Sequence, residues 1–151
     1  MSYFQILARL LLATLLSGLI GFERESHGRA AGFRTHILVC LGSTLMMLVS
    51  IYMFELYRGL TTVDPSRIAA QVVTGMGFLG AGAILRSGPT VKGLTTAASL
   101  WAVAGIGLAV GSGFYFAAIM TTGLVFVTLV VFSKMEAAFA LKGPKREEGK
   151  K

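Results

Sequence analysis

Five apolar stretches, each about as long as a helix that crosses a bilayer, fill most of this 151-residue chain. A helix needs about 20 predominantly apolar residues to cross roughly 30 Å of hydrocarbon. Only helices and closed barrels satisfy their backbone hydrogen bonds in lipid, and the stretches lack the alternating pattern of barrel strands. The sequence therefore predicts an all-α polytopic membrane protein, a compact bundle of five transmembrane helices. The predicted spans are Tyr3–Phe22, Thr35–Phe54, Arg67–Leu85, Leu94–Val110 and Phe114–Phe132.

Composition supports this class and limits the number of domains. Hydrophobic residues make up 54% of the chain and charged residues only 14%, which leaves too little polar surface for a soluble fold. We expect a transmembrane domain, residues 1–133, and a short basic tail, residues 134–151, which is too short for a core of its own. Cys40 is the only cysteine, so no disulfide forms within the chain and we expect it to pack inside its helix. The N-terminus lacks the order of a signal peptide, so we expect the first helix to be retained.

The basic residues predict the orientation of the bundle. With the C-terminus inside, eleven of the 14 lysines and arginines lie on the cytoplasmic side, and only Arg9, Arg58 and Arg67 lie outside. By the positive-inside rule we expect the N-terminus outside and the C-terminus in the cytoplasm. A basic tail beside a membrane helix contacts anionic lipid, and no groove-reading element accompanies it, so we expect no nucleic-acid partner. The basic residues of the tail are Lys134, Lys142, Lys145, Arg146, Lys150 and Lys151.

Arg9 lies on the same predicted helix as Glu23. At 1.5 Å per residue the two are separated by about 21 Å, which is less than the thickness of the hydrocarbon core. If Glu23 reaches the cytoplasmic interface, Arg9 begins inside the hydrocarbon. Two interpretations stay open: Arg9 extends its side chain to the outer interface, or it pairs within the bundle, with Asp64 as the best-placed acid.

The third apolar stretch begins with a helix-start signal. Asp64 or Ser66 can act as the N-cap, and Pro65 fits the first turn. Gln71 lies four residues after Arg67, on the same face and one turn deeper. Because a glutamine in lipid needs hydrogen-bond partners, we expect it to point inward, either as structural glue or as a ligand contact.

Glycine is frequent in the third and fourth stretches. Residues 75–82 contain the letters of the dinucleotide-binding fingerprint, but the strand, the βαβ unit and the acidic residue that this fingerprint requires are missing. Small residues let membrane helices approach closely, so we interpret these glycines as packing contacts of a tight or sliding helix pair. An unwound stretch that lines a binding cavity is the alternative. The packing candidates are Gly75, Gly77, Gly80, Gly82, Gly105 and Gly107.

Three hydroxyl side chains, Thr95, Thr96 and Ser99, open the fourth stretch. Thr95 and Ser99 share a helix face and can donate to backbone carbonyls or to a neighbouring helix. We expect a packing role for them, with ligand contact as the alternative.

The segment from Glu23 to His36 is the most charged internal part of the chain. Its two carboxylates and a histidine could bind a divalent cation such as magnesium, but its three arginines, Arg34 among them, oppose a cation, so we expect an ion-pair network. His36 could titrate near neutral pH or simply pack. The metal-ligand candidates, Glu25 and Asp64, lie on opposite sides of the membrane in the predicted topology, so they cannot form one site.

Four motifs together resemble the amino-terminal membrane domain of the MgtC/SapB family. They are GLIGFERE at Gly18–Glu25, RAAGFRTH at Arg29–His36, DPSRIAAQVVTGMGFLGAG at Asp64–Gly82 and GLTTAASLWAVAGIGLAVG at Gly93–Gly111. They follow one another in the family's order from about Leu7 to Gly113.

The resemblance implies a multi-pass protein of the bacterial inner membrane, linked to magnesium homeostasis, stress adaptation and, in pathogens, virulence. For the function it implies a regulator of other membrane complexes, including the ATP synthase, rather than a transporter. Family members carry a cytoplasmic C-terminal domain that we expect this chain to lack, so its membrane part must carry the function. The polar residues that the resemblance assigns are Glu25, Arg34, Thr35, His36, Asp64, Arg67, Gln71, Thr95, Thr96 and Ser99.

Two functions of different classes follow. The first is a membrane regulator that binds other membrane proteins, or a second copy of itself in a homodimer, through its glycine-rich helices. The alternative is a small oligomeric transporter or channel for magnesium or another ion, with its path between protomers because five helices leave little room for a pore. We expect no enzyme, because no Ser–His–acid set and no zinc motif is evident. Apart from magnesium, no cofactor is expected.

Overall fold

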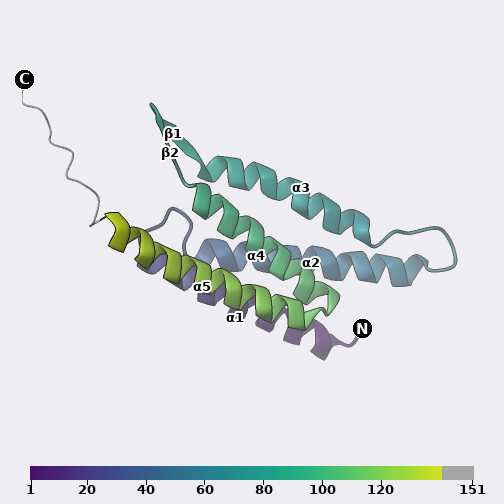
Figure 1. Ribbon diagram of the computed structural model, residues 1–151. Helices are drawn as coiled ribbons and strands as arrows, with labels where there is room; N and C mark the ends of the chain where they lie inside the picture. The colour runs from purple at the N-terminus through teal and green to yellow at the C-terminus, as the bar shows by residue number, and fades with distance from the viewer. Residues whose placement is uncertain (141–151) are drawn as a thin grey trace, which may run out of the picture.

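Five helices and one short β-hairpin form the part of the chain that the structure describes (Figure 1). The computed structural model describes the backbone of residues 1–140 and the side chains of residues 1–132. The basic side chains predicted for the tail, residues 134–151, lie outside this part. The elements are α1 (Tyr3–Ser26), α2 (Phe33–Tyr57), α3 (Ser66–Ala83), β1 (Leu85–Ser87), β2 (Thr90–Lys92), α4 (Leu94–Ser112) and α5 (Tyr115–Ala140).

Four of the five helices are long and apolar enough to cross a membrane: α1, α2, α4 and the Tyr115–Phe132 part of α5. The all-α membrane class is therefore confirmed. Helix α3, which carries Arg67 and Gln71, is not among these four, so five spans remain a prediction, as does the orientation of the termini.

The predicted third span ends earlier than expected. Helix α3 stops at Ala83, and strands β1 and β2 form an antiparallel hairpin in which Leu85 lies opposite Lys92. Gly88 at the turn has a φ of 60°, a left-handed conformation that glycine adopts without steric cost. The sequence prediction missed this hairpin, which projects beyond the ends of α3 and α4 (Figure 1).

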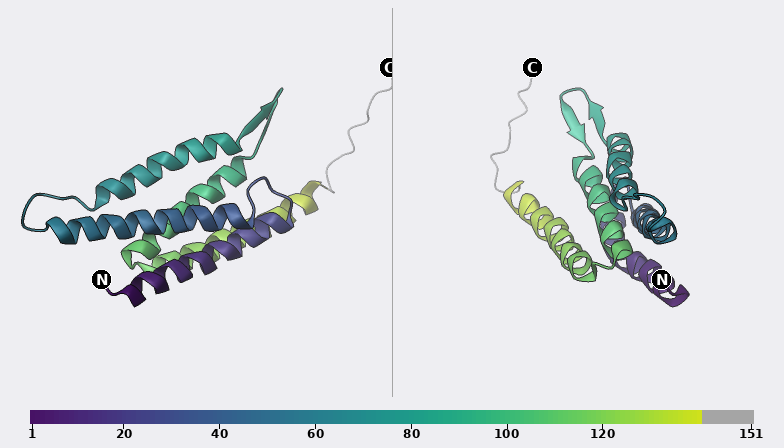
Figure 2. Two further views of the ribbon diagram at one scale, coloured as in Figure 1. Left: turned by 180° about the vertical axis from the view of Figure 1, so that it is seen from behind. Right: turned by 90° about the vertical axis from the view of Figure 1, so that its right-hand side faces the viewer.

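Helix α4 is the centre of the bundle, because it packs against all four other helices. Figure 2 shows α3 and α5 on opposite sides of α4. Successive helices run antiparallel, so their ends gather in two places. We call the end formed by residues 27–32 and 84–93 the hairpin end. The opposite end contains the N-terminus, residues 58–65 and Gly113.

The closest helix contact joins α4 to α2. A Cβ atom placed on Gly107 would lie 2.5 Å from the Cys40 carbonyl oxygen, and one on Gly111 would lie 2.6 Å from Met47 Cβ. Two small residues four positions apart thus let the helices approach closely. The Thr44 hydroxyl donates to the Gly107 carbonyl at 3.0 Å, which adds a buried hydrogen bond to this contact.

The glycines predicted for packing differ in what they contact within the chain. Gly107 lies in the tight α2–α4 contact, while Gly80 makes an ordinary contact with Ala97. At the other four a Cβ atom would meet no atom of the described residues within 4 Å, so the glycines of α3 do not hold a tight α3–α4 pair. These four are Gly75, Gly77, Gly82 and Gly105.

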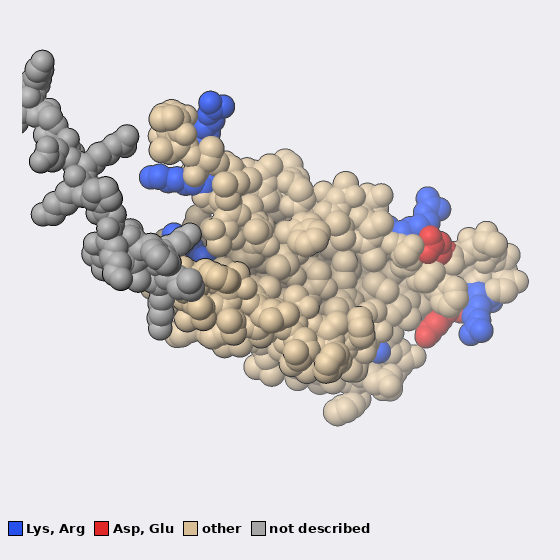
Figure 3. All heavy atoms as spheres, in the orientation of Figure 1, with Lys and Arg blue, Asp and Glu red and all other residues tan. Residues whose placement is uncertain are grey.

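The surface of the bundle is mostly apolar along its length. Large side chains such as Phe4, Leu15 and Phe116 are exposed, which suits a lipid environment. Charged side chains gather at the two ends of the molecule (Figure 3).

Candidate functional site

Five buried polar side chains from three helices meet at the hairpin end, and we call them the polar cluster. They come from the last turns of α1, the first turn of α2 and the first turns of α4, which lie side by side because the helices are antiparallel. Their members are Glu23, Arg24, His36, Thr96 and Ser99.

Glu23 and Arg24 form a buried ion pair within α1. The Arg24 guanidinium donates from Nε and Nη2 to the two carboxylate oxygens of Glu23, the second at 2.8 Å. Only 4% of the Glu23 side chain and 2% of the Arg24 side chain are exposed. His27 Nδ1 lies 3.2 Å from the same carboxylate. A buried charge is costly unless it is paired, so this bidentate pair is what lets α1 carry two charges into the bundle.

His36 connects α2 to α4. Its Nδ1 lies 2.8 Å from the Gly32 carbonyl, which can only accept, so Nδ1 carries a proton. Its Nε2 lies 3.0 Å from the Ser99 hydroxyl, which is also 2.9 Å from the Thr96 carbonyl. When the imidazole is neutral, the hydroxyl of Ser99 can therefore donate its one proton either to His36 Nε2 or to the Thr96 carbonyl. The charges of Arg24 and Glu23 act on this imidazole from α1.

Glu25 lies beside the polar cluster but has a separate role. Its carboxylate accepts from the Phe33 amide at 2.7 Å, at the start of α2, where Gly32 offers no side-chain cap. A carboxylate at a helix N-terminus satisfies a free amide and complements the helix dipole. Arg34 and Thr35 are exposed in the next turn. Thr95 is also exposed and lines a cavity of about 290 Å³ between α4 and α5.

Arg9 lies at the opposite end and does not pair with Asp64, so that interpretation is wrong. Its guanidinium donates to the Gly111 carbonyl at 2.6 Å and to the Tyr115 hydroxyl at 2.9 Å. The last carbonyls of a helix lack partners and carry the negative end of the dipole. Arg9 therefore binds the C-terminus of α4 and joins α1 to α4 and α5.

Asp64 stabilises the start of α3. Its carboxylate accepts from the Ser66 amide at 2.8 Å and from the Ser66 hydroxyl at 2.7 Å. The hydrogen bond from the Ser66 hydroxyl is the main reason why the pKa of Asp64 lies below its ordinary value. The bond from the Ser66 amide and the nearby charge of Arg67 lower this pKa further. Because the pKa is lower in the folded state, the ionised carboxylate stabilises the fold above the ordinary pKa, and this contribution is lost as the pH falls through the lowered pKa.

We therefore expect Asp64 to stay ionised when the pH falls to the ordinary carboxyl pKa, and the first turn of α3 to stay protected there. Amide exchange at Arg67, with an NMR titration of Asp64, checks this. Asp64→Ala should accelerate amide exchange at Arg67, relative to the unmodified chain, at every pH. Asp64→Asn should keep the protection of this amide, and the degree of protection should no longer depend on pH. A carboxyl that titrates at or above its ordinary value would contradict the assignment.

Arg67 and Gln71 are exposed on α3, so the inward orientation expected for Gln71 is wrong within this chain. Thr74, one turn further, is exposed on the same face and donates to the Ala70 carbonyl. The buried residue of α3, Met76, lies on the opposite face.

A metal centre is not assembled by the residues considered for it. Glu25 lies at the hairpin end and Asp64 at the opposite end, and each accepts hydrogen bonds from backbone amides. In the part of the chain that the structure describes, no three His, Cys, Asp or Glu side chains lie close enough together to hold a metal ion. Magnesium keeps several of its waters and needs few protein ligands, so a single carboxylate could still contact it.

Two residues of these sites were not among the sequence candidates. Arg24 was not singled out, although it is one of the arginines of the Glu23–His36 segment for which we expect an ion-pair network, and its pair with Glu23 belongs to such a network. Tyr115, which accepts from Arg9, is the second residue of the predicted fifth span and the first residue of α5. Its position near the end of a predicted span could have indicated an interfacial role, because tyrosine is enriched at membrane interfaces.

Comparisons with known proteins agree with these motifs. The model of the MgtC family matches residues 10–138. The Escherichia coli (strain K12) protein named "Putative magnesium transporter YhiD" is 47% identical over 133 residues, which cover 87% of this chain and 62% of that protein.

Two further relatives are similar over 114 residues. Protein SapB of Bacillus subtilis (strain 168) is 45% identical, over 73% of this chain and 49% of its own length. Protein MgtC of Salmonella typhimurium (strain 14028s / SGSC 2262) is 48% identical, over 75% of this chain and 46% of its own length. The chain thus spans about half the length of these curated relatives. No solved structure matches it.

Proposed function

The chain belongs to the MgtC family, and from this premise we propose that it is a bacterial inner-membrane regulator in magnesium homeostasis or stress adaptation. It acts by helix–helix contact with other membrane proteins, or with a second copy of itself, rather than by conducting an ion. The magnesium link rests on the name of the Escherichia coli relative and on the family.

The exposed face of α3 carries this proposal. Arg67, Gln71 and Thr74 follow one another at helical spacing on the face that points away from the rest of the chain. Arg67 lies in the first turn of α3 and Gln71 one turn deeper. An amide inside the membrane needs partners, and such groups hold membrane helices together. A helix of another protein that packs on this face would supply the missing hydrogen bonds. We call Arg67, Gln71 and Thr74 the α3 partner face.

The pairing inside the polar cluster supports the same function. Glu23 binds Arg24, and His36 binds Ser99, so these groups satisfy one another and fix the ends of α1, α2 and α4. A conducting path needs polar groups that remain available to a passing ion. Groups that are held by each other serve better to hold α1, α2 and α4 together.

A small oligomeric transporter is the second candidate. The name of the Escherichia coli relative favours it, and so does the cavity between α4 and α5, because four hydroxyl residues line it. A second protomer could close this cavity into a path. The lining hydroxyl residues are Thr95, Ser99, Thr121 and Thr128.

Magnesium flux into liposomes separates the two functions. The purified chain, reconstituted at high density around a magnesium-sensitive dye, should give no flux above that of empty vesicles. Flux that disappears in Asp64→Ala or Glu25→Ala, and persists in the control Glu55→Ala, would exclude a purely regulatory role. Glu55 is a suitable control because it is an exposed acid whose nearest charged group is the N-terminus, at 3.8 Å.

A further inference from the structure

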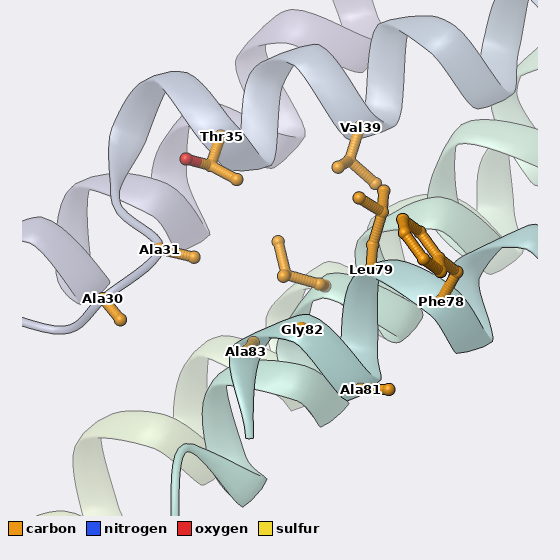
Figure 4. Close-up of a pocket in the computed structure, with 10 residues that line it drawn as sticks. Ala30, Ala31, Thr35, Val39, Phe78, Leu79, Ala81, Gly82 and Ala83 are labelled. Carbon is orange, nitrogen blue, oxygen red and sulfur yellow. The ribbon is translucent and has the colours of Figure 1, made fainter. Parts of the chain in front are cut away.

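A laterally open slot lies between α2 and α3 at the hairpin end, and we call it the α2–α3 slot. Its cavity volume is about 450 Å³, within the roughly 300–1,000 Å³ of small-molecule sites. Figure 4 shows side chains of α2, such as Val39, and of α3, such as Leu79, on its two sides, with Ala31 of the preceding loop at its end.

The lining of the slot is apolar almost throughout. Thr35 supplies the only side-chain oxygen among the lining residues, and the others are aliphatic, aromatic or glycine. Phe78, at the rim, is 84% exposed. In a bilayer such a slot contacts hydrocarbon directly, so it suits an acyl chain and not a hydrated ion.

Basic side chains surround the same end of the slot. Arg29 and Arg34 immediately precede the lining residues Ala30 and Thr35, and Arg86 and Lys92 belong to the hairpin. All four side chains are exposed. None of the four forms an ion pair with a carboxylate of the described residues. Lys and Arg side chains are grouped on the hairpin (Figure 3).

The hairpin is held close to the slot. Gly93, after β2, has a φ of 89°, and a Cβ atom there would lie 2.0 Å from the carbonyl oxygen of Ala83, which is a lining residue. The end of the hairpin therefore packs directly on the end of α3. This contact fixes the base of the hairpin, next to Lys92, at the end of α3.

The described carboxylates at this end, Glu23 and Glu25, form no ion pair with those four cations. Glu23 is held by Arg24 and His27, and Glu25 accepts from the Phe33 amide. The mouth of the slot is therefore positive while its interior is apolar, a combination that matches an anionic amphiphile.

We infer that the α2–α3 slot binds an anionic glycerophospholipid. One acyl chain lies between Val39 and Leu79, and the headgroup phosphate lies among Arg29, Arg34, Arg86 and Lys92. Each basic side chain near an anionic lipid headgroup raises the affinity for that lipid about fivefold. A second copy of the chain would bring four more cations to the same mouth, so repulsion disfavours it as the occupant.

Native mass spectrometry of the full chain in detergent micelles tests this inference. Phosphatidylglycerol and phosphatidylcholine with the same acyl chains are offered in equal amounts. We expect one phosphatidylglycerol to be retained per chain, with at least about a 25-fold preference. Arg86→Gln combined with Lys92→Gln should reduce this preference about 25-fold, while Arg58→Gln, an exposed arginine at the opposite end, should not change it.

A slot-filling variant tests the acyl chain separately. Gly82 lines the slot, and a Cβ atom there meets no atom of the described residues within 4 Å, so we expect a leucine side chain at this position to occupy part of the slot. Gly82→Leu should abolish retention of both lipids, whereas Gly123→Leu, at an equally open position on α5, should not. Circular dichroism checks that both variants stay helical.

Four results would overturn the inference. They are equal retention of the two lipids, full retention by Gly82→Leu, displacement of the lipid by millimolar inorganic phosphate, and a lipid-free dimer that Gly82→Leu dissociates.

Discussion

Gly107→Leu is expected to lower the free energy of unfolding by about 3 kcal/mol. The new Cβ atom would lie 2.5 Å from the Cys40 carbonyl oxygen and 2.8 Å from Ser43 Cβ. The first contact is with backbone, so α2 and α4 must separate to relieve it. Their separation would also break the hydrogen bond from Thr44 to the Gly107 carbonyl. Unfolding in mixed micelles of increasing SDS fraction, followed by far-UV circular dichroism, measures the loss.

Gly105→Leu is the matched control for this variant. Gly105 lies on the same helix, and a Cβ atom there meets nothing within 4 Å. Leucine is also the better helix former, so we expect a change within about 0.5 kcal/mol or a small gain in stability. Equal losses for the two variants would show that the α2–α4 contact does not depend on Gly107.

Arg24→Leu is expected to cost about 3–5 kcal/mol, because it leaves the Glu23 carboxylate buried without its main partner. His27, which is 48% exposed, would be the remaining side chain beside it. Replacing both residues, in Glu23→Leu with Arg24→Leu, should recover most of the loss, since no uncompensated charge remains. The same unfolding titration compares the single and double variants.

Arg29→Leu controls for the removal of a positive charge at this end. Arg29 is exposed and forms no ion pair with a described carboxylate, so its replacement should change stability by less than about 0.5 kcal/mol. If Arg24→Leu costs no more than Arg29→Leu, or if the double variant is no more stable than the single one, the buried pair is not a determinant of stability.

Hydrophobic patterning was sufficient to predict the helices. Long apolar runs cannot leave backbone groups unpaired in lipid, so α1, α2, α4 and α5 were evident from the sequence. The hairpin was not, because three-residue strands carry no periodicity that differs from a loop. The motifs also indicated that His36 and Ser99 matter, and the structure places them in contact.

The partners of the polar residues could not be predicted in the same way. One of the two acceptors of Arg9 is the Gly111 carbonyl, and because every residue carries a carbonyl, no side chain in the sequence marks this acceptor. Glu25 likewise accepts from a backbone amide. The role of each glycine depends on the face it occupies: Gly107 faces α2, whereas Gly105, two residues earlier, does not.

Photo-crosslinking in living bacteria tests the α3 partner face most directly. A photoreactive amino acid at position 71 or 74 of the chain should give a covalent adduct with a membrane protein or with a second copy of the chain. The same probe at Val73, which is 44% exposed on another face of α3, should not. The absence of an adduct at 71 and 74, or an equal yield at 73, would contradict a function exercised through this face.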